Sequence, residues 1–382
     1  MDAKEVYKEY ISQFLSVDPA KVFLYWKGRV ALYALLKAAG IKQGDEVLLS
    51  GLTCVVVPNA IMYLGAKPKY IDVNPETFNP SFEGYRDNFT MQTKAIIIQN
   101  TFGLSSDVKE IVKFAKDKNM IAIEDCTHGF GGTYENRPNG SYCDAAIFST
   151  QWNKPYSTGI GGFCVVNNPD LLNSIKRINE ELIQPNWRND LMLSILIWAK
   201  NHLINKKTYW IFRDIYRWLS KTGLVIGSSD GKELVGTEVP QGFFKTASKV
   251  QIRYGLKNIK NLKILIQMRK QNAVLYSCFL NENNKKYISE KFWDNHSFLV
   301  YPILVKDRMI FAKMAEKAHI KLGDWFISPL HPVKESFHIW EMDEKFVPNA
   351  SYLSKHLVNL PTSENDGDNV LAFLKTNIDN IL

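Results

Sequence analysis

The stretch TKAIIIQNTFGLSSDVKEIVKFAKDKNMIAIED, residues 93–125, determines the fold class that the sequence predicts. It contains two apolar runs, residues 95–100 and residues 120–125, and each has the length of a buried strand. Between them, residues 107–118 have the pattern of an amphipathic helix that begins after serine and aspartate. A strand, a helix and a second strand in this order predict a βαβ unit, and therefore a parallel sheet.

The flanking sequence continues this alternation in both directions. Further strands are predicted at residues 46–49, 69–73, 144–150 and 161–166, and further helices at residues 2–15, 28–39 and 56–64. The later part of the chain differs, with one long lysine-rich helix predicted over residues 249–280 and then mixed strands and helices. We therefore expect an α/β fold with a mainly parallel central sheet flanked by helices in residues 1–245. We expect a smaller C-terminal α+β domain in residues 246–382.

The composition is that of a globular protein and limits its surroundings. The chain has 382 residues, of which 46% are hydrophobic and 23% charged, and its net charge of +8 suits anionic partners. Five scattered cysteines without a C-x-x-C pair indicate neither a disulfide framework nor a metal site, so we expect a cytoplasmic protein. No apolar signal segment is evident. The lysines are spread along helices and no nucleic-acid-binding motif is present, so we expect no nucleic-acid partner.

Polar residues at strand ends are the candidates for chemistry, because ligands of parallel sheets bind beyond the carboxyl ends of the strands. Asp125 ends one predicted strand, Ser149 lies at the end of another, and Lys154 follows five residues later. Pyridoxal phosphate (PLP) needs a lysine amine for its aldehyde and a carboxylate for its ring nitrogen. Gly28, before a helix, could present backbone N–H groups to the phosphate. On spacing alone, however, an aspartate at a strand end is more often a turn residue and a single lysine is more often solvated.

Four longer stretches together resemble a known family. They are AAGIKQGDEVLLSGLTCVVVPNAIMYLGAKPKYIDVNPETFN, TKAIIIQNTFGLSSDVKEIVKFAKDKNMIAIEDCTHGFGGTY, GSYCDAAIFSTQWNKPYSTGIGGFCVV and PNASYLSKHLVNLP. In this order they resemble the DegT/DnrJ/EryC1/StrS sugar aminotransferases, which are PLP-dependent and have the aspartate-aminotransferase (type I) fold. The resemblance is poor only between about residues 176 and 240.

The resemblance implies roles for four residues. Lys154 falls on the Schiff-base lysine of the family motif F-S-x-x-x-x-K, and Ser149 falls on the phosphate-binding serine of the same motif. Asp125 falls on the aspartate that faces the pyridine nitrogen. His331, in SPLHP, falls on a histidine near the substrate end of the site.

The sequence departs from the family pattern at other cofactor-binding positions. His128 replaces a glutamine and can still donate one hydrogen bond. At the first helix, Gly28 is followed by Arg29 instead of threonine, and we expect Arg29 to contact the phosphate as a charged fork. Cys54 stands where the family has a stacking aromatic residue, and residues 244–247 lack an asparagine that reaches the partner subunit. These changes retain the lysine, aspartate and serine but put the usual substrate in doubt.

The resemblance implies an aminotransferase that moves an amino group from glutamate to a nucleotide-linked keto sugar, for surface polysaccharide or lipopolysaccharide biosynthesis. It also implies a homodimer, because family members pair their active sites across a dimer. Two alternatives remain open. One is a PLP enzyme that acts on a lipid-linked or non-sugar carbonyl substrate at the membrane surface. The other is a non-catalytic, membrane-associated member of the fold.

An aromatic and basic insertion at residues 185–238 also allows two interpretations. It could be a helical pair packed at a subunit interface or on the core. It could instead be an interfacial membrane helix within residues 191–219, which would place the protein peripherally on the inner membrane surface. In that case the anchors and the headgroup contacts would be Trp198, Tyr209, Trp210, Phe212, Tyr216, Trp218, Lys200, Lys206, Lys207, Arg213 and Arg217.

Overall fold

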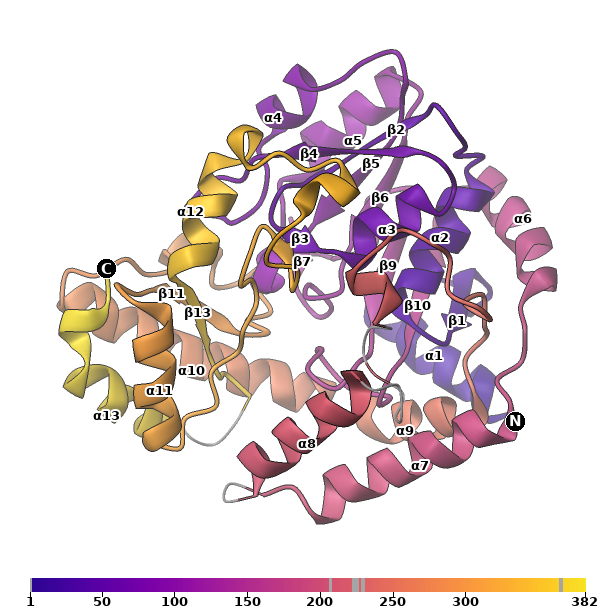
Figure 1. Ribbon diagram of the computed structural model, residues 1–382. Coiled ribbons are helices and arrows are strands. Elements are labelled where there is room, and N and C mark those ends of the chain that lie inside the picture. The colour runs from indigo at the N-terminus through magenta and orange to yellow at the C-terminus, as the bar shows by residue number, and fades with distance from the viewer. Residues whose placement is uncertain (1, 206–207, 222–226, 228–230, 364–366) are drawn as a thin grey trace.

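A twisted sheet forms the centre of the protein (Figure 1). The structure, a computed structural model, describes residues 2–205, 208–221, 227, 231–363 and 367–382. In this described part, seven strands form the sheet in the order β1 (Val22–Tyr25), β10 (Gly162–Val166), β9 (Ala145–Ser149), β6 (Ile121–Asp125), β5 (Thr93–Gln99), β2 (Glu46–Ser50) and β4 (Lys67–Ile71). Strands β4, β2, β5, β6 and β9 are mutually parallel, while β10 and β1 pair antiparallel to their neighbours. The predicted mainly parallel sheet is therefore confirmed.

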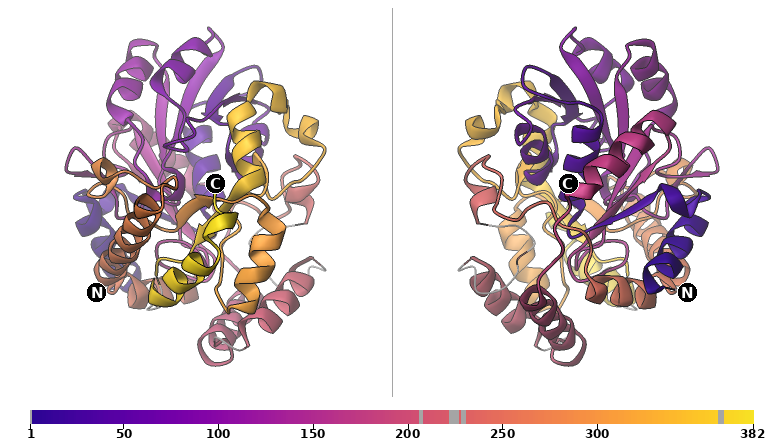
Figure 2. Two further views of the ribbon diagram at one scale, coloured as in Figure 1. Left: turned by 90° about the vertical axis from the view of Figure 1, so that its left-hand side faces the viewer. Right: turned by 90° about the vertical axis from the view of Figure 1, so that its right-hand side faces the viewer.

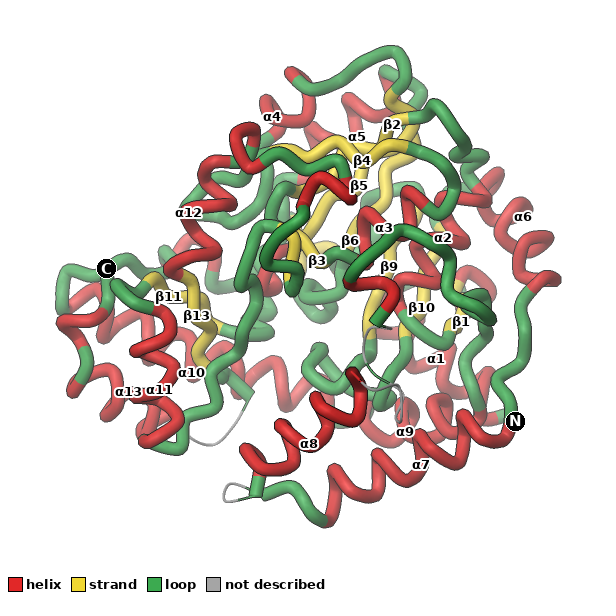
Figure 3. Tube along the Cα trace, viewed as in Figure 1, coloured by secondary structure: helices red, strands yellow, loops and turns green. Residues whose placement is uncertain are grey.

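Helices cover both faces of the sheet, as Figure 3 shows by colour. One face carries α2 (Gly28–Ala38), α3 (Val56–Met62) and α6 (Pro169–Ile178), and the other carries α1 (Ala3–Leu15), α4 (Phe82–Asp87), α5 (Val108–Asp117) and α9 (Lys249–Ile259). The apolar run of β5 supplies both cores because neighbouring side chains of a strand point to opposite faces. Ile97 packs with the α2 side, whereas Ile96 and Ile98 pack against Ile111 of α5. Because helices cover both faces of the sheet at β5, apolar and polar residues do not alternate along this run.

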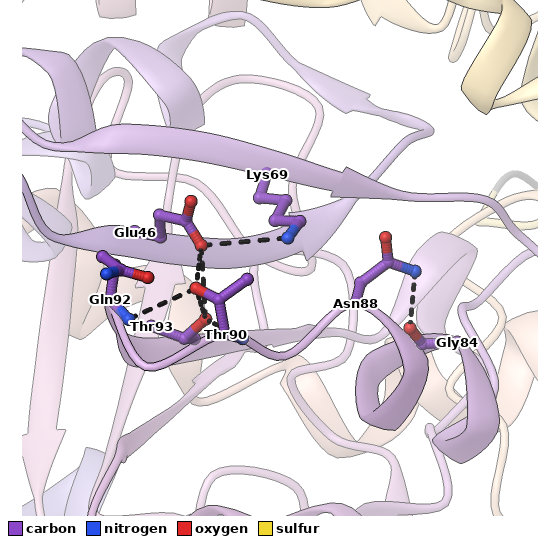
Figure 4. Close-up of polar contacts among 7 residues, drawn as sticks. All are labelled: Glu46, Lys69, Gly84, Asn88, Thr90, Gln92 and Thr93. Atoms are coloured by element: carbon purple, nitrogen blue, oxygen red, sulfur yellow. Dashed lines mark hydrogen bonds and ion pairs between the residues drawn. The ribbon is translucent and has the colours of Figure 1, made fainter.

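Polar contacts connect the amino ends of β2 and β5 with the middle of β4 (Figure 4). Glu46, the first residue of β2, accepts a hydrogen bond from Thr90 Oγ1 at 2.5 Å and lies 3.8 Å from Lys69 Nζ of β4. Thr93, the first residue of β5, contacts the same carboxylate oxygen at 3.5 Å. These side chains thus connect β4, β2 and β5 on the side of the sheet away from the carboxyl ends of its strands.

The predicted long helix over residues 249–280 is wrong in one respect, since it consists of two helices. Helix α9 ends at Ile259 and α10 (Leu262–Glu282) begins after Asn261. The two helices serve different cores: Ile252 and Ile259 of α9 pack on the side of α1, whereas Tyr276 and Leu280 of α10 pack in the C-terminal part. The predicted division of the chain at residue 245 stays a prediction.

The C-terminal part is a small α+β unit that also reaches back to the main sheet. Strands β11 (Tyr301–Leu304) and β13 (Leu357–Leu360) pair antiparallel and pack with α10, α11 (Arg308–Lys317) and α13 (Gly367–Thr376). Helix α12 (Pro348–His356) packs beside Leu52 and Val73. Strand β12 (Leu330–His331) pairs in parallel with β3 (Thr53–Cys54), which brings residues 325–332 to the large sheet.

The remaining short elements are one small hairpin and several 3₁₀ helices. They are β7 (Thr133–Tyr134), β8 (Arg137–Pro138), and the 3₁₀ helices Pro19–Lys21, Thr101–Gly103, Asn179–Glu181, Lys232–Leu234, Glu290–Phe292, Phe337–Trp340, Glu344–Phe346 and Ile378–Asn380.

The insertion forms two helices that project from one edge of the molecule (Figures 1 and 2). Helix α7 (Trp187–His202) is held by Leu193, which is fully buried against Trp26 and Ile160, and it is followed by α8 (Tyr209–Lys221). Of the predicted membrane contacts, Lys206, Lys207 and the side chains of Arg217 and Trp218 lie outside the described residues. Within the described residues, each helix is too short or too polar to cross a membrane.

Candidate active site

A cavity lies where β5, β6 and β9 end, at the carboxyl edge of the sheet. All eight residues that the sequence singles out line it: Gly28, Arg29, Cys54, Asp125, His128, Ser149, Lys154 and His331. They come from the start of α2, from β3, from the ends of β6 and β9 with their following loops, and from β12. The parallel strands explain the convergence, because they bring residues far apart in the sequence to the same edge.

Asp125 is the last residue of β6 and is 3% exposed. Its Oδ1 accepts a hydrogen bond from the backbone N–H of Thr127 at 2.9 Å, which fixes the carboxylate just beyond the strand. Burial raises the pKa of Asp125, while the hydrogen bonds from Thr127 and the charge of Lys154 oppose that shift. Asp125 is therefore a fixed carboxyl group that a nearby positive charge would hold in its ionised form.

Lys154 lies in the loop between β9 and β10, and its side chain turns into the cavity. Its Nζ atom lies 4.2 Å from the centre of the Trp325 ring. Burial lowers the pKa of Lys154 to about 8, against the opposing effects of Cys54 and Asp125. A lysine with this pKa has a substantial neutral fraction near neutral pH, which is what a nucleophilic amine requires.

The loop that carries Lys154 is held from outside the cavity. Arg269 Nη2 donates to the carbonyl oxygen of Pro155 at 2.9 Å, and Asn258 Nδ2 donates to that of Ser157 at 2.7 Å. On another side, Leu193 of α7 packs with Ile160. The lysine is thus presented by a rigid loop that helices from the insertion and from the C-terminal half support.

The start of α2 lies directly against β9 and β10, and glycine makes this approach feasible. A Cβ atom at Gly28 would lie 3.2 Å from the carbonyl oxygen of Phe148 and from Cβ of Ser149, and one at Gly162 would lie 2.3 Å from Cα of Gly28. Ser149 therefore lies beside the amino end of a helix whose N-cap residue, Lys27, makes no side-chain cap hydrogen bond. A helix amino end beside a serine hydroxyl suits an anionic group such as a phosphate.

Arg29 has a partner that the sequence does not reveal. Its Nη1 atom lies 2.5 Å from Glu233 Oε2, and the two side chains are 4% and 2% exposed. Glu233 belongs to the 3₁₀ helix Lys232–Leu234 in the insertion. A pair separated by 204 positions leaves no periodic signal in the sequence, so Glu233 could not be found there.

Aromatic side chains, among them Trp325, His128 and His331, form another wall of the cavity. The Trp325 ring lies 5.0 Å from that of His128 and 4.6 Å from that of His331. His128 Nδ1 accepts a hydrogen bond from the backbone N–H of Phe102 at 3.2 Å, which leaves the proton of the neutral ring on Nε2. Burial lowers the pKa of His128 well below its usual value, so the ring is neutral.

Trp325 and Cys54 complete the wall. Trp325 was missed by the sequence reasoning, although it precedes the SPLHP motif by only a few residues. Cys54 lines the same cavity and pairs with His331 through β3 and β12. Burial raises the pKa of the Cys54 thiol, so it stays protonated.

These residues fit PLP. The cavity offers a lysine amine of lowered pKa, a buried carboxyl group, and a serine beside a helix amino end for the phosphate. A mainly parallel sheet with this set at its carboxyl edge defines the class: the fold of PLP-dependent aminotransferases. The profile of the DegT/DnrJ/EryC1/StrS aminotransferase family matches residues 24–192 and 214–371, and the chain belongs to this family.

Two relatives match the chain over segments of less than half its length. GDP-perosamine synthase of Escherichia coli O157:H7 is 40% identical over 144 residues, which are 38% of this chain and 40% of that protein. GDP-perosamine synthase of Caulobacter vibrioides is 35% identical over 161 residues, 42% of this chain and 43% of that protein. The chain thus spans less than half the length of these two relatives. The crystal structure of an aminotransferase from Streptoalloteichus hindustanus has a TM-score of 0.74 at 17% identity, over 99% of this chain and 91% of that one, and it supports the fold alone.

Proposed function

We propose that the protein is a PLP-dependent aminotransferase that moves an amino group from glutamate to a nucleotide-linked keto sugar, for the synthesis of a surface polysaccharide. The observation that carries the proposal is that Lys154, Asp125 and Ser149 share one cavity with the start of α2. The names of the two relatives, both GDP-perosamine synthases, support a nucleotide-linked sugar.

Each side chain has a distinct task in this proposal. When bound, PLP supplies an electron sink for the bond that breaks at the substrate carbon. Lys154 would hold the cofactor covalently, and its amine would serve as general base and general acid for the proton that moves at the substrate carbon. Asp125 balances positive charge on the ring nitrogen, and its fixed position through Thr127 keeps that charge in place. Ser149 and the first N–H groups of α2 bind the phosphate.

A spectroscopic half-reaction tests this function. The purified protein should be yellow, and glutamate should remove the visible absorbance as the amino group passes to the cofactor. A nucleotide-linked keto sugar should then restore it, whereas the same sugar without the nucleotide should be a poorer acceptor. A colourless protein that takes up no added PLP would exclude the proposal.

The proposal also includes the quaternary structure and the location. We propose a homodimer in the cytoplasm. The dimer is proposed by analogy with the family, whose members pair their active sites across a dimer. Sedimentation equilibrium should give twice the chain mass of 43.8 kDa. A single-chain mass at micromolar concentration would contradict the dimer but not the chemistry.

A second candidate is peripheral contact with an anionic membrane surface through α7. Four apolar side chains on one side of this helix are between 53% and 69% exposed: Trp187, Leu191, Ile195 and Trp198. The other side of α7 is held by Leu193, so the helix is apolar on both sides. Tryptophans at the two ends of an exposed apolar stripe, in a protein with a net charge of +8, suit an interfacial helix.

Flotation with anionic liposomes tests this contact. The wild-type protein should float, and a variant with serine at the four exposed α7 positions should remain in the aqueous fraction. A matched control carries serine at four other exposed apolar positions, Met91, Ile264, Met309 and Phe346, and should still float. If the wild type does not float and the α7 variant instead loses its dimer, the helix belongs to a subunit interface.

A further inference from the structure

A charged side chain of the insertion contacts a residue of the cavity wall. Arg29 lines the cavity next to Gly28, and Glu233 of the insertion holds its guanidinium at 2.5 Å. Both side chains are almost completely buried, so the pair is shielded from solvent. The buried carboxylate therefore lies behind Arg29 and within electrostatic range of Cys54, another residue of the cavity wall.

Glu233 is held in this position by its backbone as well as by Arg29. Its carbonyl oxygen accepts a hydrogen bond from Asn59 Nδ2 at 2.8 Å, and Asn59 Oδ1 in turn accepts one from Trp340 Nε1 at 2.6 Å. The next residue, Leu234, packs beside Trp340. The segment is thus fixed at two further points, one at the carbonyl oxygen of Glu233 and one at Leu234.

The Glu233 carboxylate and a phosphate bound at the same site would repel each other. A phosphate monoester carries about −1.5 to −2 charges near neutral pH, and like charges that share one site disfavour each other. A carboxylate and a phosphate that approach the same guanidinium compete for its donors, because guanidinium binds either group through the same fork of N–H bonds. The pair seen here therefore engages a guanidinium donor that a phosphate would also use.

We propose that Glu233 sets the affinity of the site for the cofactor's phosphate, by occupying on Arg29 the position that the phosphate takes over. This inference rests on the proposed function, since it assumes PLP as the ligand. It makes the insertion part of the cofactor site, because the insertion supplies the competing carboxylate.

Binding of two ligands that differ only in the phosphate tests the proposal. Affinities of PLP and of pyridoxal, which lacks the phosphate, are measured on the apo-protein for the wild type, for Glu233→Gln and for Glu238→Gln. Glutamine keeps a hydrogen-bond acceptor for Arg29 but removes the charge, so PLP should bind about fivefold to tenfold more tightly while pyridoxal is unchanged. Glu238 is exposed in the same segment, and its variant should behave like the wild type. A purely structural role would change both ligands alike, and an unchanged or lower ratio of the two affinities in Glu233→Gln would overturn the proposal.

Hydrogen exchange on the wild type keeps the proposal testable if Glu233→Gln does not fold. The probe is inorganic phosphate, added to the apo-protein, and the readout is exchange of the amides in residues 231–236. Exchange should become several-fold faster, because the carboxylate loses its partner. Unchanged or slower exchange would overturn the inference. If the protein binds neither PLP nor pyridoxal, the proposed function is wrong. The experiment with inorganic phosphate would still show whether a phosphate displaces Glu233 from Arg29.

Discussion

Two lysines, Lys154 buried in the cavity and Lys200 half-buried on the insertion, have similar local chemistry. Burial lowers the pKa of both Lys154 and Lys200 to about 8. Each amine lies over an indole ring, Lys154 at 4.2 Å from Trp325 and Lys200 at 4.9 Å from Trp152. They differ in what surrounds them, since Lys154 lies in a cavity within the electrostatic range of Asp125, whereas the shift at Lys200 has burial as its cause. A lowered pKa thus marks a buried lysine, and a partner carboxyl group in a cavity distinguishes a candidate catalytic one.

The first prediction, which has the largest expected effect, replaces each of the two lysines with methionine. Lys154→Met should lose the visible absorbance of bound PLP and at least about a thousandfold of the aminotransferase rate, because the covalent anchor and the proton carrier disappear together. Lys200→Met should stay within about threefold of the wild-type rate, since methionine fills a similar volume against Trp152. Single-turnover absorbance with glutamate measures both. A yellow, active Lys154→Met protein would show that the assignment is wrong.

The second prediction removes the group that distinguishes the two lysines. Asp125→Asn should lower the rate by roughly a hundredfold, the usual effect of losing one electrostatic stabiliser. The neighbouring Glu124 is the matched control, because it is also buried but is occupied by Asn100 Nδ2 at 2.7 Å and by the N–H of Gly140 at 2.7 Å. Glu124→Gln should lower the melting temperature and leave the rate nearly unchanged. Equal rates for Asp125→Asn and the wild type would remove Asp125 from the site.

The third prediction concerns the pH dependence of cofactor capture by the apo-protein. The neutral amine of Lys154 is the reactive form, so the capture rate should rise about tenfold per pH unit at low pH and level off above about pH 8. In Asp125→Asn the midpoint should move to lower pH, because the carboxylate raises the pKa of Lys154. Stopped-flow absorbance after mixing with PLP measures this, and Lys200→Met should keep the wild-type midpoint. A midpoint near the ordinary lysine value would contradict the burial argument.

The sequence predicted the parts of this site that local pattern determines. The apolar runs before Asp125 and Ser149 indicated buried strands, and parallel strands necessarily end at one edge, so the meeting of these residues with Lys154 followed from the order of elements. The contact between Arg29 and Glu233 did not follow, because tertiary packing alone brings residues 204 positions apart together.

The break between α9 and α10 was also hidden from the sequence. The residues between them are ordinary helix formers or neutral in a helix, and the two helices separate because each packs on a different core. Similarly, the apolar character of α7 was evident, but the side that stays exposed could be read only from the position of Leu193. The sequence pattern of a helix shows which of its faces are apolar, whereas the elements that pack around it determine which face is buried.

The smallest predicted effect concerns the free energy of unfolding that the protein loses because Lys200 is shielded from water. Its pKa falls from 10.5 to about 8 on folding, so the folded state penalises the charged form. The unfolded chain therefore binds more protons between these two values, and wild-type stability should rise with pH through this window. Methionine at position 200 has no such penalty, so Lys200→Met should raise the free energy of unfolding by about 1–2 kcal/mol at pH 7, after allowance for the lost contact with Trp152.

This gain should shrink as the pH approaches 10.5, since the wild-type lysine is then neutral in both states. Urea unfolding at pH 7 and at pH 9.5 measures the two differences. Lys249 is exposed at the start of α9, and Lys249→Met should change stability by less than about 0.5 kcal/mol at either pH. If Lys200→Met were no more stable than the wild type at pH 7, the contact with the Trp152 ring would outweigh the burial cost. The two lysines would then differ in their effect on stability as well as in their reactivity. The contact between Lys200 and an indole ring would stabilise the folded protein, whereas the similar contact of Lys154 leaves its amine able to react.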